Sequence, residues 1–461
     1  MHIHILGICG TFMGSLAQLA KQLGHQVSGC DANVYPPMST QLELAGINLI
    51  EGFDPAQLQP APDLIIVGNA MSRGNPCIEY MLDKGLAYTS GPQWLGENLL
   101  RNQHVLSVSG THGKTTTSSM LAKILDFGGL NPGFLIGGVP SDFGLSARLS
   151  NNSESGYFVV EADEYDSAFF DKRSKFVHYH SNTLVINNLE FDHADIFENL
   201  PAIQRQFHHL VRTISSTGSV IYPAGVESIQ QVIDQGCWSE VQTLAERSSD
   251  SGQSRWRYQL LQNDGSSFQV SDGDDNHMAV VNWQHTGLHN VLNAVAAIAA
   301  AATVGLNVKT ACAALSEFVG VKRRMEVIYQ DGGVTVYDDF AHHPTAIKTT
   351  LEGLRAKVGG EKIIAIVEPR SATMKMGMHQ GILSGAVNAA DQVLWYKSAA
   401  VSWDIGSVAQ GCEIPAAVCD DIEQLLASTI SQLSGTETAH IVIMSNGGFE
   451  GFHRRLVAAL Q

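Results

Sequence analysis

The chain has 461 residues, a hydrophobic fraction of 44% and a formal net charge of −17. That length predicts two to four domains, and the hydrophobic fraction is enough for ordinary buried cores. The acidic balance argues against nonspecific nucleic-acid binding, and no uninterrupted apolar run reaches the ~18 residues of a membrane span. The seven cysteines form no C-x-x-C pair, and the N-terminus lacks signal-peptide features. We therefore expect a cytoplasmic protein without a membrane anchor or a structural zinc site.

The first hundred residues alternate short apolar runs with helix-like segments. Strands are predicted at 2–6, 26–29 and 64–68, and helices at 15–23 and 77–84. Such alternation is typical of a parallel sheet with crossover helices, so the first unit is predicted to be α/β.

Two further α/β units are predicted along the rest of the chain. The second should contain the strands 105–109, 157–160 and 183–186, antiparallel hairpins within 256–281, and an Ala-rich helix after Leu288. The third should contain the strands 334–337, 362–367, 392–396 and 440–444, with helices between them. The predicted domains are 1–102, 103–320 and 321–461.

The strongest local signal is a glycine–lysine loop between a predicted strand and a helix expected to begin near Thr116. Its residues are Gly110, Thr111, His112, Gly113, Lys114, Thr115 and Thr116. Backbone N–H groups and the helix dipole at such a place can hold phosphate oxygens. Lys114 would neutralise the β- and γ-phosphates, and Thr115 would offer a hydroxyl to Mg²⁺. Val108 replaces the first glycine of the general pattern, and a glycine turn with a surface lysine is the alternative.

Acidic and histidine residues follow two other predicted strands. Glu161 comes directly after an apolar strand, where nucleotide-binding enzymes place a carboxylate for Mg²⁺. A solvated acidic loop is the alternative interpretation of that segment. His193 follows the strand 183–186 and is a candidate metal ligand, although an isolated histidine is more often structural.

A second glycine loop, 7–14, follows the first predicted strand. By itself it weakly indicates a dinucleotide-binding fold, and Asp31 at the end of the next strand could be taken for the ribose-binding acid of an NAD enzyme. An NAD-dependent oxidoreductase is therefore one rival hypothesis. It leaves Lys114 and Glu161 without roles.

Six segments together, in this order, resemble the Mur ligase family. They are 110–116, 161–164, 192–193, 287–294, 322–325 and 338–344. The resemblance implies a three-domain architecture: a Rossmann-like N-terminal domain that binds a UDP-sugar, a central P-loop ATPase domain and a Rossmann-like C-terminal domain that closes over the site. It also implies ATP and Mg²⁺ as cofactors. A non-catalytic UDP-sugar sensor on the same scaffold is a second rival.

Residue roles follow from the resemblance by position. Lys114 would bind the ATP phosphates, Thr115 and Glu161 one Mg²⁺, and His193 a second. The other residues implied at the nucleotide are Asn290 and Asn293 at adenine with help from His289, Arg324 at the γ-phosphate, Asp339 at the ribose and His342 near the reaction centre. The segment 194–210 contains no lysine, so the carbamylated lysine of some family members is not expected.

The resemblance also implies where the two other substrates bind. UDP-N-acetylmuramate would be held by Gly10, Thr11, Phe12, Met13, Asn69, Ala70, Met71 and Ser72. The segments 368–375 and 445–451 resemble the family branch that uses the murein tripeptide L-Ala-γ-D-Glu-meso-diaminopimelate, with Arg370, Lys375 and Asn446 at the acceptor. The expected reaction is ATP-dependent amide formation at the lactyl carboxylate through an acyl phosphate. Ligation of free L-alanine is the alternative.

Overall fold

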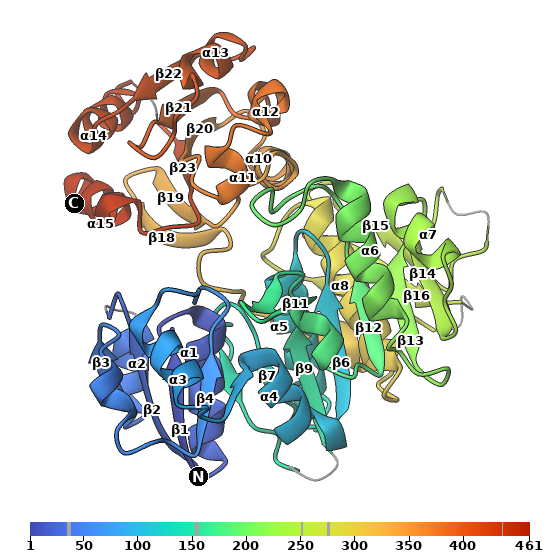
Figure 1. Ribbon diagram of the computed structural model, residues 1–461. Coiled ribbons are helices and arrows are strands. Elements are labelled where there is room, and N and C mark those ends of the chain that lie inside the picture. The colour runs from blue at the N-terminus through green and yellow to red at the C-terminus, as the bar shows by residue number, and fades with distance from the viewer. Residues whose placement is uncertain (35–37, 153–155, 250–251, 274–276, 436) are drawn as a thin grey trace.

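The computed structural model describes residues 1–34, 38–152, 156–249, 252–273, 277–435 and 437–461. Three α/β units follow one another along the chain (Figure 1), as the alternation of strands and helices predicts. None of the helices among these residues is both long and apolar enough to cross a lipid bilayer.

The N-terminal unit is a five-stranded parallel sheet in the order β3-β2-β1-β4-β5. Its strands are β1 (His2–Leu6), β2 (Gln26–Asp31), β3 (Asn48–Glu51), β4 (Leu64–Val67) and β5 (Tyr88–Ser90). Its helices are α1 (Thr11–Gln22), α2 (Met38–Leu44), α3 (Pro76–Asp83) and α4 (Gly91–Asn98). The predicted strands and helices are confirmed, although α1 begins four residues before the predicted Ser15, directly after the glycine loop.

The middle unit is built on a ten-stranded sheet in the order β17-β16-β15-β14-β13-β12-β6-β9-β7-β8. Its strands are β6 (His104–Ser109), β7 (Gly133–Leu135), β8 (Ala147–Arg148), β9 (Tyr157–Glu161), β12 (Thr183–Ile186), β13 (Ser219–Pro223), β14 (Glu240–Glu246), β15 (Trp256–Leu260), β16 (Ser267–Asp272) and β17 (Met278–Asn282). The predicted hairpins are the antiparallel β15–β17, and residues 274–276 of that range lie outside the described residues.

The helices of the middle unit are α5 (Lys114–Phe127), α6 (Leu200–Val211), α7 (Glu227–Asp234), α8 (Leu288–Ala302) and α9 (Val308–Ser316). A separate hairpin, β10 (Asp166–Ala168) with β11 (Asp171–Ser174), leads into the short helix η3 (Lys175–His178). Helix α5 begins two residues before the predicted Thr116, because Gly113 precedes it in the left-handed conformation, with φ +78°.

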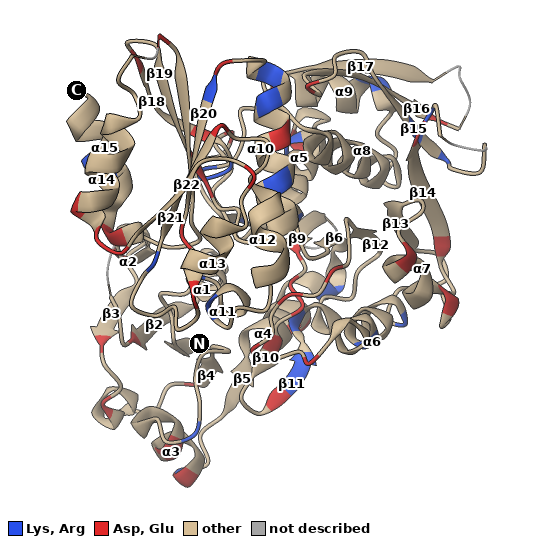
Figure 2. Ribbon diagram, turned by 90° about the horizontal axis from the view of Figure 1, so that it is seen from above, with Lys and Arg blue, Asp and Glu red and all other residues tan. Residues whose placement is uncertain are grey.

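The C-terminal unit is a six-stranded sheet in the order β18-β19-β23-β20-β21-β22, parallel except for the first pair. Its strands are β18 (Glu326–Asp331), β19 (Val334–Asp339), β20 (Lys362–Val367), β21 (Gln392–Tyr396), β22 (Ala416–Cys419) and β23 (Ala439–Met444). Its helices are α10 (Pro344–Val358), α11 (Ala372–Lys375), α12 (Gln380–Ala386), α13 (Ile405–Gln410), α14 (Ile422–Ser431) and α15 (Phe452–Leu460). Helix α10 contacts α8 of the middle unit, and Figure 2 shows this region from above.

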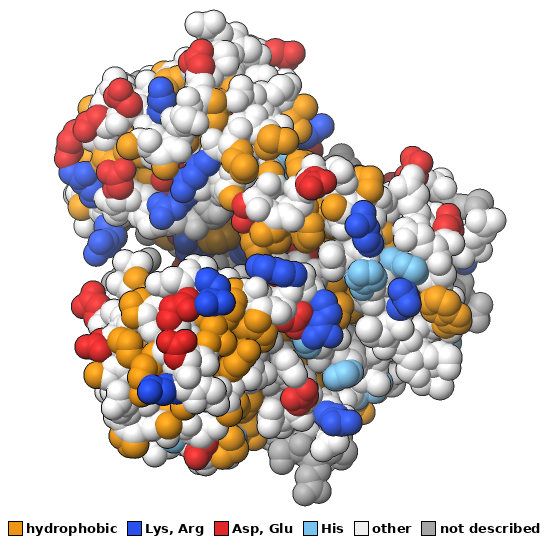
Figure 3. Space-filling model, viewed as in Figure 1, with side chains coloured by type: hydrophobic (Ala, Val, Ile, Leu, Met, Phe, Trp, Pro, Cys, Tyr) orange, Lys and Arg blue, Asp and Glu red, His pale blue; other side chains and the backbone are white. Residues whose placement is uncertain are grey.

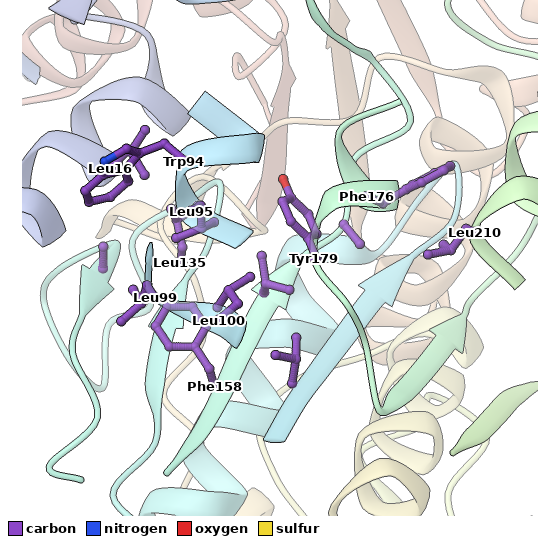
Figure 4. Close-up of a cluster of buried hydrophobic side chains, with 14 of the residues drawn as sticks. Leu16, Trp94, Leu95, Leu99, Leu100, Leu135, Phe158, Phe176, Tyr179 and Leu210 are labelled. Carbon is purple, nitrogen blue, oxygen red and sulfur yellow. The ribbon is translucent and has the colours of Figure 1, made fainter. Parts of the chain in front are cut away.

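The N-terminal and middle units share one buried apolar cluster. Leu16 and Trp94 from the first unit belong to the same cluster as Phe158, Phe176 and Tyr179 from the second (Figure 4). The C-terminal unit has clusters of its own, on the two faces of its sheet. The apolar core is therefore continuous across the first junction and separate at the second.

The chain passes into the C-terminal unit through a short segment that pairs with the middle unit. Val321 forms an isolated antiparallel bridge with Pro140, and the Lys322 N–H donates to Val139 O at 3.1 Å. Val321 is buried in the core of the middle unit. This segment thus attaches the start of the C-terminal unit to the middle unit.

Candidate active site

The glycine–lysine loop connects β6 to α5 at the carboxyl end of the central strands. Gly110 and Gly113 both have positive φ, +124° and +78°, which L side chains rarely adopt. Lys114 Nζ donates to Gly110 O at 2.7 Å and to Glu164 Oε2 at 2.8 Å. The ammonium is therefore held inside the loop, where phosphate oxygens would be expected to lie.

The loop that follows β12 supports this loop from the side. The His112 N–H donates to Asn188 Oδ1 at 2.7 Å, and Asn188 Nδ2 donates back to His112 O at 3.1 Å. Thr111 Oγ1 accepts the Glu190 N–H at 2.8 Å. Thr116 lies half-buried in the first turn of α5. These contacts fix the loop backbone, as a preorganised anion site requires.

Thr115 and Glu161 lie together beneath the loop. Thr115 Oγ1 donates to Glu161 Oε1 at 3.1 Å, and the Gly137 N–H donates to Glu161 Oε2 at 2.7 Å. Burial raises the pKa of the Glu161 carboxyl, although Lys114 opposes this. A hydroxyl and a carboxylate are oxygen ligands of the kind that Mg²⁺ prefers, so this pair fits a divalent cation.

His193 lies in an acidic cluster beside Lys114. Its Nε2 is 2.9 Å from Glu164 Oε1, so Glu164 bridges Lys114 and His193. Potential ligand atoms of Asp163, Glu164 and His193 lie within 4.8 Å of one another, which fits a second cation. Burial alone would lower the pKa of His193, but Glu164 raises it. His193 is a non-glycine residue at φ +57°, a conformation held by the surrounding contacts.

The residues assigned to adenine lie at the start of α8. Asn293 is buried against the phosphate loop, since a Cβ at Gly113 would lie 2.5 Å from Asn293 Oδ1. Asn290 Nδ2 instead donates to Thr286 O at 2.8 Å. Burial lowers the pKa of His289 to about 4, so this ring is neutral at pH 7. Asn293 is therefore next to the phosphate loop, whereas Asn290 is engaged within its own turn.

The C-terminal unit reaches this region through the ends of β18 and β19. Arg324 Nη2 donates to Thr115 Oγ1 at 3.4 Å, and its guanidinium lies 4.9 Å from the Phe340 ring centroid. Asp339 accepts two backbone N–H groups at 2.8 Å, from the residues at 325 and 341. His342 Nδ1 donates to Phe340 O at 2.9 Å, and burial lowers the pKa of His342 to about 4.

The two segments assigned to the UDP-sugar also meet. Strands β1 and β4 are adjacent, and Met71 after β4 packs against Gly7 in the first glycine loop. In that loop Gly10 caps α1, with Thr11, Phe12 and Met13 in its first turn, and Asn69, Ala70 and Ser72 flank Met71. Asp31 accepts the Cys9 N–H at 2.9 Å, so this carboxylate braces the loop itself.

Arg370 and Asn446 follow β20 and β23, which are neighbours in the C-terminal sheet. The Arg370 guanidinium lies against Gly447, and its Nη1 is 3.7 Å from Glu368 Oε1. Asn446 Oδ1 is buried without a hydrogen-bond partner among the described residues. Lys375 is half-buried in the last turn of α11. Figure 3 shows Lys and Arg side chains on both rims of the hollow between the N-terminal and C-terminal units.

Several polar contacts at the site have no signal in the sequence. Thr373 Oγ1 on α11 donates to Asp192 Oδ1 at 2.6 Å, and Thr345 Oγ1 on α10 donates to Glu190 Oε2 at 2.7 Å. Both pairs join the C-terminal unit to the loop that carries His193. Because each pair spans more than 150 residues, only the folded arrangement reveals them.

Three family models match consecutive parts of the chain. They are the Mur ligase family catalytic domain over residues 2–103, the Mur ligase middle domain over 108–301 and the Mur ligase glutamate ligase domain over 323–447. The matched segments contain the glycine–lysine loop, the acidic cluster, the residues just before β18 and those at the end of β19.

Individual relatives agree over the full length. The chain is 51% identical to the UDP-N-acetylmuramate--L-alanyl-gamma-D-glutamyl-meso-2,6-diaminoheptandioate ligase of Haemophilus influenzae, covering 100% of this chain and 99% of that one. The crystal structure of a murein peptide ligase from Psychrobacter arcticus is 51% identical, with a TM-score of 0.76 and coverage of 100% and 98%. A UDP-N-acetylmuramate--L-alanine ligase from Syntrophomonas wolfei is 32% identical, over 82% of this chain and 79% of that one.

The identity is thus higher to the peptide-joining relative than to the alanine-joining one, and it extends through the C-terminal unit. The three family models, the shared fold and the conjunction of phosphate loop and acidic cluster lead to one conclusion: the chain belongs to the Mur ligase family, whose members are ATP-dependent ligases that form amide bonds.

Proposed function

We propose that this ligase joins the lactyl carboxylate of UDP-N-acetylmuramate to the amine of L-Ala-γ-D-Glu-meso-diaminopimelate, through an acyl phosphate. The observation that carries the proposal is the bridge from Lys114 through Glu164 to His193, at the meeting point of all three units. The names of the relatives that are 51% identical supply the substrates. We also propose the division into units 1–102, 103–320 and 321–461, with the donor, the nucleotide and the acceptor assigned in that order.

ATP and Mg²⁺ are the proposed cofactors of the middle unit. The loop 110–116 would hold the phosphates, and Thr115, Glu161 and His193 would hold the metal. Bound Mg²⁺ would supply charge neutralisation at the transferring phosphoryl group. Lys114 would add an ammonium on the same oxygens, and Arg324, whose Nη2 donates to Thr115 Oγ1, would reach them from the C-terminal unit.

Positioning and charge neutralisation account for most of the proposed chemistry. A lactyl carboxylate oxygen bonds to the γ-phosphorus while the bond to the bridging oxygen breaks and ADP leaves. The acceptor amine then attacks the acyl carbon, loses a proton and displaces phosphate. The acyl phosphate reacts with water as well as with the amine, so docking of the C-terminal unit through Thr373 and Asp192 serves to exclude water.

The acceptor assignment rests on charge. The tripeptide carries several carboxylates, whereas free L-alanine carries one, so a tripeptide site needs additional donors. Arg370 and Lys375 supply two cations, and the guanidinium of Arg370 suits a carboxylate bidentately. Asn446 adds an amide at the neighbouring strand end, next to the glycine against which Arg370 lies.

The test supplies UDP-N-acetylmuramate and ATP and compares the tripeptide with free L-alanine as acceptor. Arg370→Ala and Lys375→Ala should each raise the tripeptide KM about tenfold, as for a lost charged hydrogen bond, with little change in the KM for ATP. Lys348→Ala is the matched control, because that side chain is 59% exposed on the same unit. Preference of the wild type for L-alanine would replace this proposal by the alanine-adding alternative.

A further inference from the structure

Lys175 is a buried lysine to which the motifs and the reaction described above give no role. It begins η3 directly after the β10–β11 hairpin, and its backbone N–H donates to Tyr165 O at 2.8 Å. Its side chain is only 9% exposed. Lysine is almost never buried to this extent without a charged partner, because removing an ammonium from water is costly. The neighbours of the Lys175 ammonium therefore indicate the role of this side chain.

The Lys175 ammonium lies where the N-terminal unit meets the acidic cluster. Its Nζ is 2.8 Å from Asp163 Oδ2, 5.5 Å from the Phe12 ring centroid and 5.6 Å from the Tyr165 ring centroid. Phe12 belongs to the loop assigned to the UDP-sugar, and Asp163 belongs to the cluster that contains His193. One ammonium therefore contacts both the donor side and the phosphate side of the site.

Two lysines approach the acidic cluster from different elements. Lys114 comes from the phosphate loop and pairs with Glu164, whereas Lys175 comes from η3 and pairs with Asp163. The proposed reaction brings two anions together, the γ-phosphate and the donor carboxylate, and Lys114 serves the first. An ammonium has three N–H donors, and Asp163 is the one hydrogen-bond acceptor of Lys175 Nζ among the described residues. Donors thus remain for a ligand oxygen.

We propose that Lys175 binds the lactyl carboxylate of the donor and aligns it with the γ-phosphorus. This assignment rests on the proposed function and adds a specificity-determining residue to it. Lys175 donates hydrogen bonds to the attacking carboxylate and transfers no proton. Asp163 fixes the ammonium, and the rings of Phe12 and Tyr165 favour a cation between them while limiting access of water.

The experiment measures binding to the full-length protein and does not depend on turnover. Calorimetry compares UDP-N-acetylmuramate with UDP-N-acetylglucosamine, which has the same nucleotide and sugar but no lactyl carboxylate. The wild type should bind the muramate more tightly. Lys175→Met should weaken the binding of UDP-N-acetylmuramate about tenfold or more. It should change the binding of UDP-N-acetylglucosamine less than about twofold. Lys172→Met is the matched control on the hairpin that leads into η3, because Lys172 is 70% exposed and pairs with Asp166.

If Lys175→Met weakens the binding of both ligands equally, the proposal is overturned, because Lys175 would then support the fold rather than the lactyl carboxylate. Unchanged binding of both would overturn it as well. If Lys175→Met does not fold, Lys175→Gln takes its place and is judged by the same two outcomes. If the wild type does not bind UDP-N-acetylmuramate more tightly than UDP-N-acetylglucosamine, that result contradicts the proposed function itself. This outcome is distinct from one in which only the role of Lys175 fails.

Discussion

The middle unit meets its two neighbours through contacts of opposite character. At the N-terminal junction, Trp94 packs in one buried apolar cluster with Phe176. At the C-terminal junction, the contacts include side-chain hydrogen bonds such as that from Thr373 to Asp192, and the apolar clusters of the two units are separate. Separating the first pair of units would expose a large apolar surface, whereas separating the second would exchange hydrogen bonds with water.

The difference teaches which part of the enzyme can move. When two apolar surfaces separate, the stabilising free energy of their burial is lost in full, at roughly 25 cal/mol per Å² of apolar area. A hydrogen bond that water can replace contributes only about 0.5–1.5 kcal/mol net. We therefore infer that the N-terminal and middle units behave as one body and that the C-terminal unit opens and closes during the reaction.

The largest effect is expected from breaking the apolar junction. Trp94→Ala should lower the free energy of unfolding by about 3–5 kcal/mol, because it leaves a cavity in the shared core. Urea denaturation followed by circular dichroism measures this change, and the two units should unfold in one transition. Trp238→Ala is the control, since Trp238 is 62% exposed. Separate unfolding of the N-terminal unit alone would contradict a shared core.

The next largest effect concerns the site between the junctions. Lys114→Ala should lower the rate of ligation at least about 100-fold, as for the loss of a transition-state contact worth about 2.7 kcal/mol or more. Circular dichroism should show an intact fold. Lys123→Ala, on the same helix and paired with Asp142, should retain activity. More than a tenth of wild-type activity in Lys114→Ala would remove Lys114 from the transition state.

The polar junction is tested by a smaller change. Thr373→Val keeps the shape of the side chain but removes the donor to Asp192 and the acceptor of the Ala194 N–H. Docking should weaken by about 1–2 kcal/mol, which appears as a roughly tenfold lower kcat with little change in Tm. Thr349→Val, whose hydroxyl bonds within α10, should leave kcat unchanged. Equal kcat values in both variants would show that the Thr373 contact does not support closure.

The smallest effect is a pH dependence of the same junction. Burial, with help from His112 and His379, lowers the pKa of His343 to about 3, although Asp192 and Glu190 oppose this. The separated state, with an ordinary pKa near 6.5, binds more protons, so docking is fully stabilised above pH 6.5 and weakens as pH falls below it. The change should be about 1 kcal/mol or less by pH 6.

Small-angle scattering measures this prediction as a radius of gyration that rises between pH 7.5 and 5.5. His343→Asn should flatten the response, because asparagine also caps a helix and does not titrate in this range. His343 accepts the Thr345 N–H at 3.2 Å as the cap of α10, so the variant preserves that helix. The same pH response in the variant would assign the effect to another group.

Much of the fold could be predicted from hydrophobic pattern alone. The strands at 183–186, 362–367 and 392–396 have the predicted bounds, because each is a short, mostly apolar run that is an interior strand of its sheet. The sequence pattern does not predict the short hairpin β10–β11. Its two strands, 166–168 and 171–174, are mostly polar and show no alternation of apolar and polar residues.

The candidate site could be predicted in part, for a similar reason. Parallel strands end at one edge of a sheet, so the strands predicted at 105–109, 157–160 and 183–186 place Lys114, Glu161 and His193 near one another. Glu164, which connects Lys114 with His193, could not be singled out from the adjacent acids. Identifying Glu164 among these acids requires knowing where each side chain points. That direction depends on the turn after β9 and on packing, which no local sequence pattern encodes.

The bridge between Pro140 and Val321 has a mechanical consequence for the C-terminal unit. The neighbouring Gly138 is so close to Thr115 and Val321 that a Cβ there would lie 2.8 Å and 3.3 Å from their side chains. If the C-terminal unit turns about this bridge as it opens and closes, its pivot adjoins the phosphate end of the site. In a rotation, displacement grows with distance from the axis, so the distal helices sweep a wide arc while Arg324 travels a short one. Reactants can enter and products leave at the far rim while the guanidinium stays close to its working position.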